Sequence, residues 1–177
     1  VHSGLFLASN TESELASVIS HEIAHINQKH ISRFLLQQER ASYQSTFIMA
    51  VALLLARSNP QLASTAMAGA SAGSVQGALD FTRENEKEAD RVGISILADA
   101  GFDPNGASSF FSILAEKNRL TSTPLAFLLI HPLPESRIAD ARTRAASFRP
   151  RNIPESINFN LAKSRILARY YANPRRN

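Results

Sequence analysis

Residues 11–30 read TESELASVISHEIAHINQKH, a segment that opens with a helix start signal and carries two histidines one turn apart. Thr11 and Glu14 form a T-x-x-E capping box, in which each side chain accepts a hydrogen bond from the other residue's backbone N–H. Apolar residues then repeat at helical spacing: Leu15, Val18, Ile19, Ile23 and Ile26. We expect a helix that buries this apolar face. Since no Gly or Pro interrupts it, the helix is predicted to run from about residue 12 to about residue 40.

His21, Glu22 and His25 form an HExxH motif inside this predicted helix. Residues four apart share a helix face, so the two imidazoles can bind one divalent cation. Glu22 projects about 100° around the axis, where its carboxylate can take a proton from a metal-activated water. The motif indicates a zinc-dependent hydrolase with one Zn²⁺ per chain. His30 lies five residues beyond His25, points elsewhere on a continuous helix, and is interpreted as a surface or packing histidine.

A catalytic zinc site needs a third protein ligand, and a second acidic segment supplies it. Residues 81–100 are predicted to form a helix with Gly101 as its C-terminal stop. Glu86 and Asp90 are four apart and share a face of this helix. We expect Glu86 to bind the metal and Asp90 to accept the second ring N–H of His21, which fixes the tautomer of that imidazole.

Small residues on the same helix favour a close crossing of the two metal-site helices. Ala89 and Gly93 present little side-chain volume, so the second helix can approach the HExxH helix closely enough for Glu86 to reach the metal. Glu84 and Glu88 are interpreted as members of a solvated acidic face.

His131 and Arg137 are two further candidate site residues. His131 follows the apolar run of residues 125–130 and precedes a proline, which predicts an extended segment or turn. Three roles are open for it: a hydrogen bond to the developing oxyanion, a fourth zinc ligand that holds the enzyme latent until displaced, or a structural role in a loop. Arg137, on the first turn of a following helix, either steadies the tetrahedral intermediate or pairs with Asp90 or Glu84.

These motifs resemble those of a known family. HExxH, followed some sixty residues later by E-x-x-x-D within ENEKEADRVG (residues 84–93), looks like the gluzincin endopeptidases of the HtpX and CAAX-prenyl-protease type. GFDP at residues 101–104 and HPLPESR at residues 131–137 are similar to the same pattern, so the resemblance covers most of residues 1–149. The whole run most resembles the soluble periplasmic branch, the BepA (YfgC) type, which is associated with outer-membrane protein quality control.

The resemblance implies zinc at His21, His25 and Glu86, general-base work at Glu22, and a mainly α, zincin-type helical domain. It implies an endopeptidase that hydrolyses peptide bonds of unfolded or misassembled outer-membrane proteins, with the outer-membrane assembly machinery as a partner. The implied location is the bacterial periplasm, with membrane association as the alternative. Two other functions remain open: a zinc-containing chaperone or scaffold with little proteolysis, and a protease held closed by His131.

Length and composition suit one peptidase domain at residues 1–149. Few segments alternate with period two, which predicts a mainly α structure. Substrate in such enzymes adds to an edge strand before the active-site helix. Val1-His2 is therefore interpreted as a remnant of that strand, with the preceding part of the domain missing. The chain has no cysteine, which excludes disulfides and thiolate zinc sites.

Residues 41–79 lie between the two metal motifs and carry a single charge, that of Arg57. The most apolar part, residues 46–56, is too short to span a bilayer as a helix. A small-xxx-small pattern, which favours close packing, is formed by Gly69, Gly73 and Gly77. The break at residues 57–60 predicts a helical hairpin inserted near the cleft, with contact to a membrane surface as the alternative.

Residues 150–177 are predicted to form a basic helical tail. From Arg137 to Arg176 there are ten Arg or Lys residues against Asp140 and Glu155, which concentrates the net charge of +4 at this end. No nucleic-acid motif accompanies the charge, so no nucleic-acid partner is expected. The family branch continues into a tetratricopeptide-repeat domain beyond this region, and no repeat pair is visible here.

Overall fold

The computed structural model describes residues 3–121, 126–149, 153–154 and 156–172. These residues form helices and no strand, which confirms the mainly α prediction. The helices are α1 (Ser3–Ala8), α2 (Glu12–Asn27), α3 (His30–Ala56), α4 (Pro60–Asp99), α5 (Asn105–Leu120), α6 (Ala126–Ile130), α7 (Glu135–Ala145) and α8 (Ile157–Ala172). Val1-His2, interpreted above as an edge-strand remnant, lies outside the described residues.

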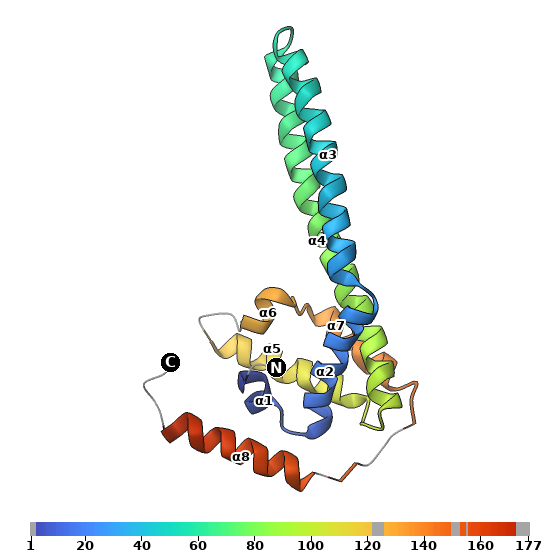
Figure 1. Ribbon diagram of the computed structural model, residues 1–177, viewed down its shortest axis with the longest axis vertical. Helices are drawn as coiled ribbons and strands as arrows, with labels where there is room; N and C mark the ends of the chain where they lie inside the picture. Colours follow the sequence, from blue (N-terminus) through green and yellow to red (C-terminus); the bar gives the residue numbers. More distant parts are fainter. Residues whose placement is uncertain (1–2, 122–125, 150–152, 155, 173–177) are drawn as a thin grey trace. The chain divides into compact units, whose positions relative to one another are not determined.

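The chain divides into two compact units. Unit 1 comprises Val1–Ala24 and Lys87–Asn177, and unit 2 comprises His25–Glu86. The division falls inside α2 and α4, each of which is one continuous helix. Figure 1 shows every helix by its label.

The start of α2 follows the predicted capping box. The Thr11 backbone N–H donates to Glu14 Oε2 at 3.3 Å, and the Glu14 N–H donates to Thr11 Oγ1 at 3.2 Å. The Ser109 hydroxyl also donates to Glu14 Oε1, at 2.6 Å. The capping carboxylate therefore joins the start of α2 to α5 as well as closing its first turn.

The buried face of α2 differs from the predicted one. Ile19 and Ile23 are 41% and 39% exposed, and Ile26 is 72% exposed, so the expectation that the isoleucines are buried is wrong. The buried residues of α2 are Ser13, Glu14, Ser17, Val18, Ser20, His21 and Ala24. Most of these are small, and small side chains let neighbouring helices approach closely. The face of α2 that carries His21 is therefore packed closely against its neighbours through small side chains, while the larger isoleucines stay partly exposed.

The predicted helix from residue 12 to 40 is also wrong, because the chain breaks after Asn27 and starts again at His30. Lys29 has φ 54° and ψ 38°, the left-handed conformation that a residue with a Cβ rarely adopts. The Lys29 N–H donates to Ile26 O at 3.0 Å, which closes the end of α2. The left-handed residue changes the direction of the chain, so α3 is a new helix.

Unit 2 is built from α3 and the first part of α4, which lie side by side (Figure 1). The turn between them is at residues 57–59, where the Asn59 side chain accepts the Leu62 N–H at 3.0 Å. Phe34 and Phe81 pack with ring centroids 6.2 Å apart, and Gln37 Nε2 donates to Gly77 O at 3.2 Å. α4 begins at Pro60, some twenty residues before the predicted start of the second metal-site helix.

Large apolar side chains stand exposed along this pair of helices. They include Leu35, Leu36, Tyr43, Phe47, Met49, Leu53, Leu54, Leu62, Met67, Val75 and Leu79. Within the described residues, no helix combines the length and hydropathy that a membrane crossing requires.

Unit 1 holds the hydrophobic core. Its buried members are Leu5, Ala8, Val18, Ile94, Leu97, Ala107, Phe110, Phe111, Leu114 and Ala141. α4 ends at Asp99, and Gly101 forms the predicted stop just beyond it. The φ of Gly101 is 93°, which suits glycine, and the Phe102 N–H donates to Leu97 O at 3.1 Å in a Schellman-type arrangement. α8 lies against α1, with Phe6 and Phe159 stacked at 5.3 Å. The core thus anchors the helices that present the site residues of unit 1.

Candidate metal centre

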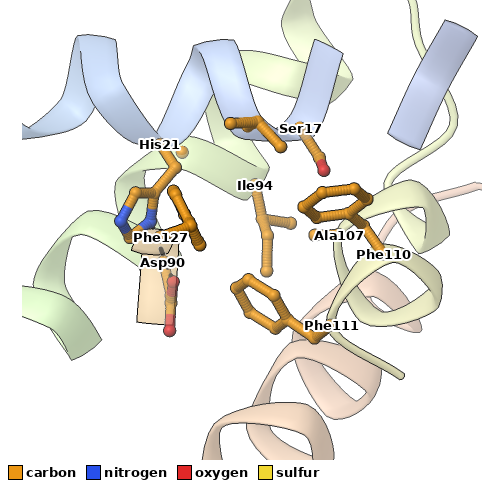
Figure 2. A pocket seen from close by; sticks show the side chains of 10 residues that line it. Ser17, His21, Asp90, Ile94, Ala107, Phe110, Phe111 and Phe127 are labelled. Atoms are coloured by element: carbon orange, nitrogen blue, oxygen red, sulfur yellow. Dashed lines mark ion pairs between the residues drawn. The ribbon is translucent and has the colours of Figure 1, made fainter. Parts of the chain in front are cut away.

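His21, Asp90 and Arg137 form a buried chain of polar contacts in unit 1. His21 Nδ1 lies 3.0 Å from Asp90 Oδ1, as Figure 2 shows from close by. Arg137 Nε and Nη2 each donate to a different Asp90 oxygen, both at 2.7 Å, and Arg137 Nη1 donates to Pro132 O at 2.6 Å. All three side chains are almost fully buried. Of the roles left open for Arg137, the structure shows the pair with Asp90.

The Asp90 carboxylate is held in its charged form by these contacts. Burial raises the pKa of Asp90, but the hydrogen bonds of His21 and Arg137 and the positive guanidinium outweigh it, so the pKa lies below its ordinary value of 3.8. An ionised Asp90 accepts the Nδ1–H of His21, which leaves His21 Nε2 with a lone pair for a metal.

His131 lies beside His21 and Glu22, just after α6. Its Nδ1 is 3.4 Å from His21 Nε2, and its Nε2 is 3.4 Å from Glu22 Oε1. Phe127 stacks on the His131 ring at 4.7 Å and lines the same pocket as His21, where Figure 2 labels both residues. His131 therefore faces the nitrogen of His21 that Asp90 leaves available.

A small apolar cavity of about 10 Å³ is lined in part by His21 (Figure 2). Its lining residues are Ser17, Val18, His21, Asp90, Gly93, Ile94, Ala107, Phe110, Phe111 and Phe127. A space of this size is at the lower limit for one water molecule. The cavity is a packing gap beside His21, and it is too small for a substrate side chain.

Unit 2 contributes its own cluster, His25, Glu86 and His30. His25 Nε2 lies 3.3 Å from Glu86 Oε1, and Glu86 is 3% exposed. His25 Nδ1 lies 2.8 Å from His30 Nδ1. His30 is itself buried, so of the two interpretations left open for it, surface or packing, the structure shows packing. The contact depends on the break at Lys29, which no sequence signal marks.

The chemistry of these residues fits zinc. The Nδ1 atom of His21 contacts Asp90, and the Nδ1 atom of His25 contacts His30. The Nε2 atom of His21 faces the imidazole of His131, and that of His25 faces the carboxylate of Glu86. Imidazole and carboxylate are both ligands that zinc binds. This is the usual arrangement of metal-binding histidines, whose second nitrogen is fixed by a neighbouring group. Along α2 the two histidines are one helical turn apart, as are Glu86 and Asp90 along α4.

Gly93 permits the close approach of α4 to α2 at His21. A Cβ on Gly93 would lie 3.1 Å from both Cα and N of His21, tighter than side chains normally pack against backbone. The predicted role of this glycine is thereby confirmed.

We expect Gly93→Ala to lower the free energy of unfolding by about 1–3 kcal/mol, because the added methyl group must displace the backbone of α2. Urea unfolding followed by circular dichroism measures the change. Gly77→Ala is the matched control on the same helix, since a Cβ there meets nothing within 4 Å. It should stabilise α4 by up to about 1 kcal/mol. Stabilisation by both substitutions would contradict the close approach.

Comparison with known proteins points to one family. The profile of peptidase family M48 matches residues 1–145. Proteins of Vibrio cholerae and Escherichia coli are 48% and 46% identical over 170 and 171 residues, each alignment covering 96% of this chain. The Escherichia coli protein is named beta-barrel assembly-enhancing protease. The mitochondrial metalloendopeptidase OMA1 of Schizosaccharomyces pombe is 30% identical over 138 residues, which are 78% of this chain and 38% of that protein. The chain spans about a third (35%) of the length of the two bacterial relatives.

Proposed function

Because the chain belongs to peptidase family M48, we propose that it is the catalytic part of a zinc-dependent endopeptidase in which His21, His25 and Glu86 hold one Zn²⁺. Each of these residues offers a ligand atom of a kind that zinc binds. The main support for the proposal is that each imidazole is oriented through its Nδ1 atom. His21 Nδ1 lies 3.0 Å from Asp90 Oδ1, and His25 Nδ1 lies 2.8 Å from His30 Nδ1.

The proposed reaction is hydrolysis of a peptide bond by water. Zinc, when bound, supplies a Lewis acid that polarises the substrate carbonyl and acidifies water. Glu22 receives the proton of the attacking water and returns it to the nitrogen of the leaving amine. Its side chain is 46% exposed, so substrate can reach it, and His131 lies 3.4 Å away. Asp90 and Arg137 hold His21 in place and do not touch substrate.

The proposed substrates are unfolded or misassembled polypeptides, and the proposed setting is outer-membrane protein assembly. Support comes from the name of the Escherichia coli relative, which refers to beta-barrel assembly. Location in the bacterial periplasm and contact with the assembly machinery belong to the same proposal.

Metal removal tests the proposal directly. Chelation of the purified protein should reduce cleavage of an unfolded casein-type substrate to background, and addition of one equivalent of Zn²⁺ should restore it. Zinc content by mass spectrometry and fluorescence release from the labelled substrate measure the two quantities. Cleavage that continues unchanged in the metal-free protein would contradict the proposal.

A latent form of the same enzyme is the second candidate. The position of His131 Nδ1, 3.4 Å from His21 Nε2, supports a fourth zinc ligand that occupies the place of substrate. The same histidine could instead serve the oxyanion, and His131→Ala separates these roles. A latent site becomes more active when His131 is removed, whereas loss of an oxyanion donor lowers activity. Zinc bound without cleavage in either protein would favour the scaffold function.

A further inference from the structure

The geometry of unit 2 assigns a positioning role to His30. We propose that His30 Nδ1 accepts the Nδ1–H of His25 and thereby holds the His25 ring in the tautomer and orientation that present Nε2 to the metal. The inference rests on the proposed function, in which His25 is a zinc ligand. His30 is not itself a ligand in this arrangement.

The contact between the two rings is close and buried. The two Nδ1 atoms are 2.8 Å apart, and the rings meet edge to face with centroids 4.7 Å apart at 85°. His30 is 3% exposed, so water does not compete effectively for its nitrogen. A hydrogen bond at this distance fixes both position and orientation of the partner ring.

The break between α2 and α3 creates this contact. On one continuous helix, residues five apart are separated by about 140° around the axis, and their side chains cannot meet. Lys29 in the left-handed conformation turns the chain so that the first residue of α3 faces back onto α2. A lysine persists in this conformation only where the surrounding structure requires it. Here the left-handed conformation of Lys29 accompanies the contact between His25 and His30.

The direction of the hydrogen bond follows from the chemistry of imidazole. Two facing Nδ1 atoms at hydrogen-bond distance share one proton. A neutral histidine that binds a metal through Nε2 carries its proton on Nδ1, so His25 is the donor and His30 the acceptor. His25 Nε2 is correspondingly the atom that faces Glu86 Oε1, at 3.3 Å. His30 thus does for His25 what Asp90 does for His21, with a neutral acceptor in place of a carboxylate.

The first measurement is the tautomer of His30 in the zinc-loaded protein. Zinc on Nε2 of His25 leaves the proton of that ring on Nδ1, so nitrogen-15 NMR should show His30 with its proton on Nε2 and its Nδ1 as the acceptor. A wild-type His30 that carries its proton on Nδ1 would overturn the inference, whether or not any substituted protein folds.

The second measurement is zinc affinity by competition with a chelator. We expect His30→Leu to weaken zinc binding by about 10–100-fold, the range for loss of a group that fixes a ligand. His30→Asn places an amide oxygen near the position of Nδ1 and should recover most of the loss. Folded His30→Leu that binds zinc as tightly as the wild type would overturn the inference.

Phe34→Leu is the matched control on α3. It alters the packing of Phe34 against Phe81 without touching His25, so it tests whether any disturbance of α3 weakens zinc binding. Its zinc affinity should equal that of the wild type, and a loss equal to that of His30→Leu would contradict a specific role for His30. If the wild type binds no zinc, the proposed function fails. If it binds zinc but the tautomer of His30 or the zinc affinity of His30→Leu is not as expected, the inference about His30 alone fails.

Discussion

Glu22→Gln is expected to slow peptide-bond hydrolysis by about 10²–10⁴-fold while leaving zinc content unchanged. The amide occupies the same volume as the carboxylate but cannot accept the proton of the attacking water. The proposed ligands His21, His25 and Glu86 are untouched, so metal binding should persist. Steady-state cleavage of an unfolded labelled protein and zinc analysis of the same sample provide the two readouts.

Glu84→Gln is the matched control for this substitution. Glu84 is exposed on α4, and the change removes the same charge without removing a proton acceptor from the site. Its cleavage rate should remain that of the wild type. Cleavage by Glu22→Gln at the rate of Glu84→Gln would exclude Glu22 as the general base, and loss of zinc from Glu22→Gln would make it structural.

The second large effect is expected for Arg137→Met, which should lower the free energy of unfolding by about 3–5 kcal/mol at pH 7. The substitution leaves the Asp90 carboxylate buried without the two 2.7 Å hydrogen bonds of the guanidinium. It also removes the bond to Pro132 O, which anchors the segment that follows His131. Urea unfolding followed by far-ultraviolet circular dichroism measures the loss.

The pH dependence of this loss has a definite sign. Since the pKa of Asp90 is lowered on folding, the ion pair contributes fully above the ordinary value of 3.8, and its contribution disappears as the pH falls through the lowered pKa. The difference between wild type and Arg137→Met should therefore shrink in acid. Arg144→Met is the control, because Arg144 pairs with Asp140 at 2.7 Å on the surface of the same helix. That exposed pair should contribute less than about 1 kcal/mol. Equal losses from the two substitutions would contradict the argument.

Local sequence patterns predicted the parts of the fold that depend on neighbours three to five residues apart. The capping box of Thr11 and Glu14 and the stop at Gly101 are confirmed, because each is a short-range hydrogen-bond pattern with a residue-type signature. Gly93 is confirmed for a related reason, since a glycine inside a helix is unfavourable unless close packing requires it.

Other features that depend on tertiary structure were not predicted. The break at Lys29 has no signature, because lysine is an ordinary helix former and its left-handed conformation is imposed from outside. The burial of His30 follows from that break, and the sequence left open whether this histidine lies on the surface or packs inside. Hydrophobic periodicity predicted that Ile19 and Ile23 lie on the buried face of α2, and both are partly exposed. The buried face carries serines instead, because their small side chains permit close packing of the helices.

The candidate site shows the same division. HExxH and the E-x-x-x-D pattern each identify two groups on one helix turn, and this spacing could be predicted from helix geometry alone. The partner of Arg137 could not, because Asp90 and Glu84 were equally available in sequence. The structure shows Asp90, whose buried carboxylate is stabilised by a cationic donor.

The two ends of α4 differ in a way that bears on how the helix opens. Near Ala89, Ile94 and Leu97 the side chains are almost completely enclosed, whereas Gly69, Gly73 and Gly77 have open space where a Cβ would stand. Each glycine weakens a helix by about 1 kcal/mol relative to alanine. We therefore expect the backbone amides of the glycine-containing turns to exchange with solvent faster than those near Ile94, because the helix opens more often where it is less buried. The two halves of this one helix should therefore differ in how well their backbone amides are protected from exchange. The half that contains the glycines is where we expect a protease to cut first.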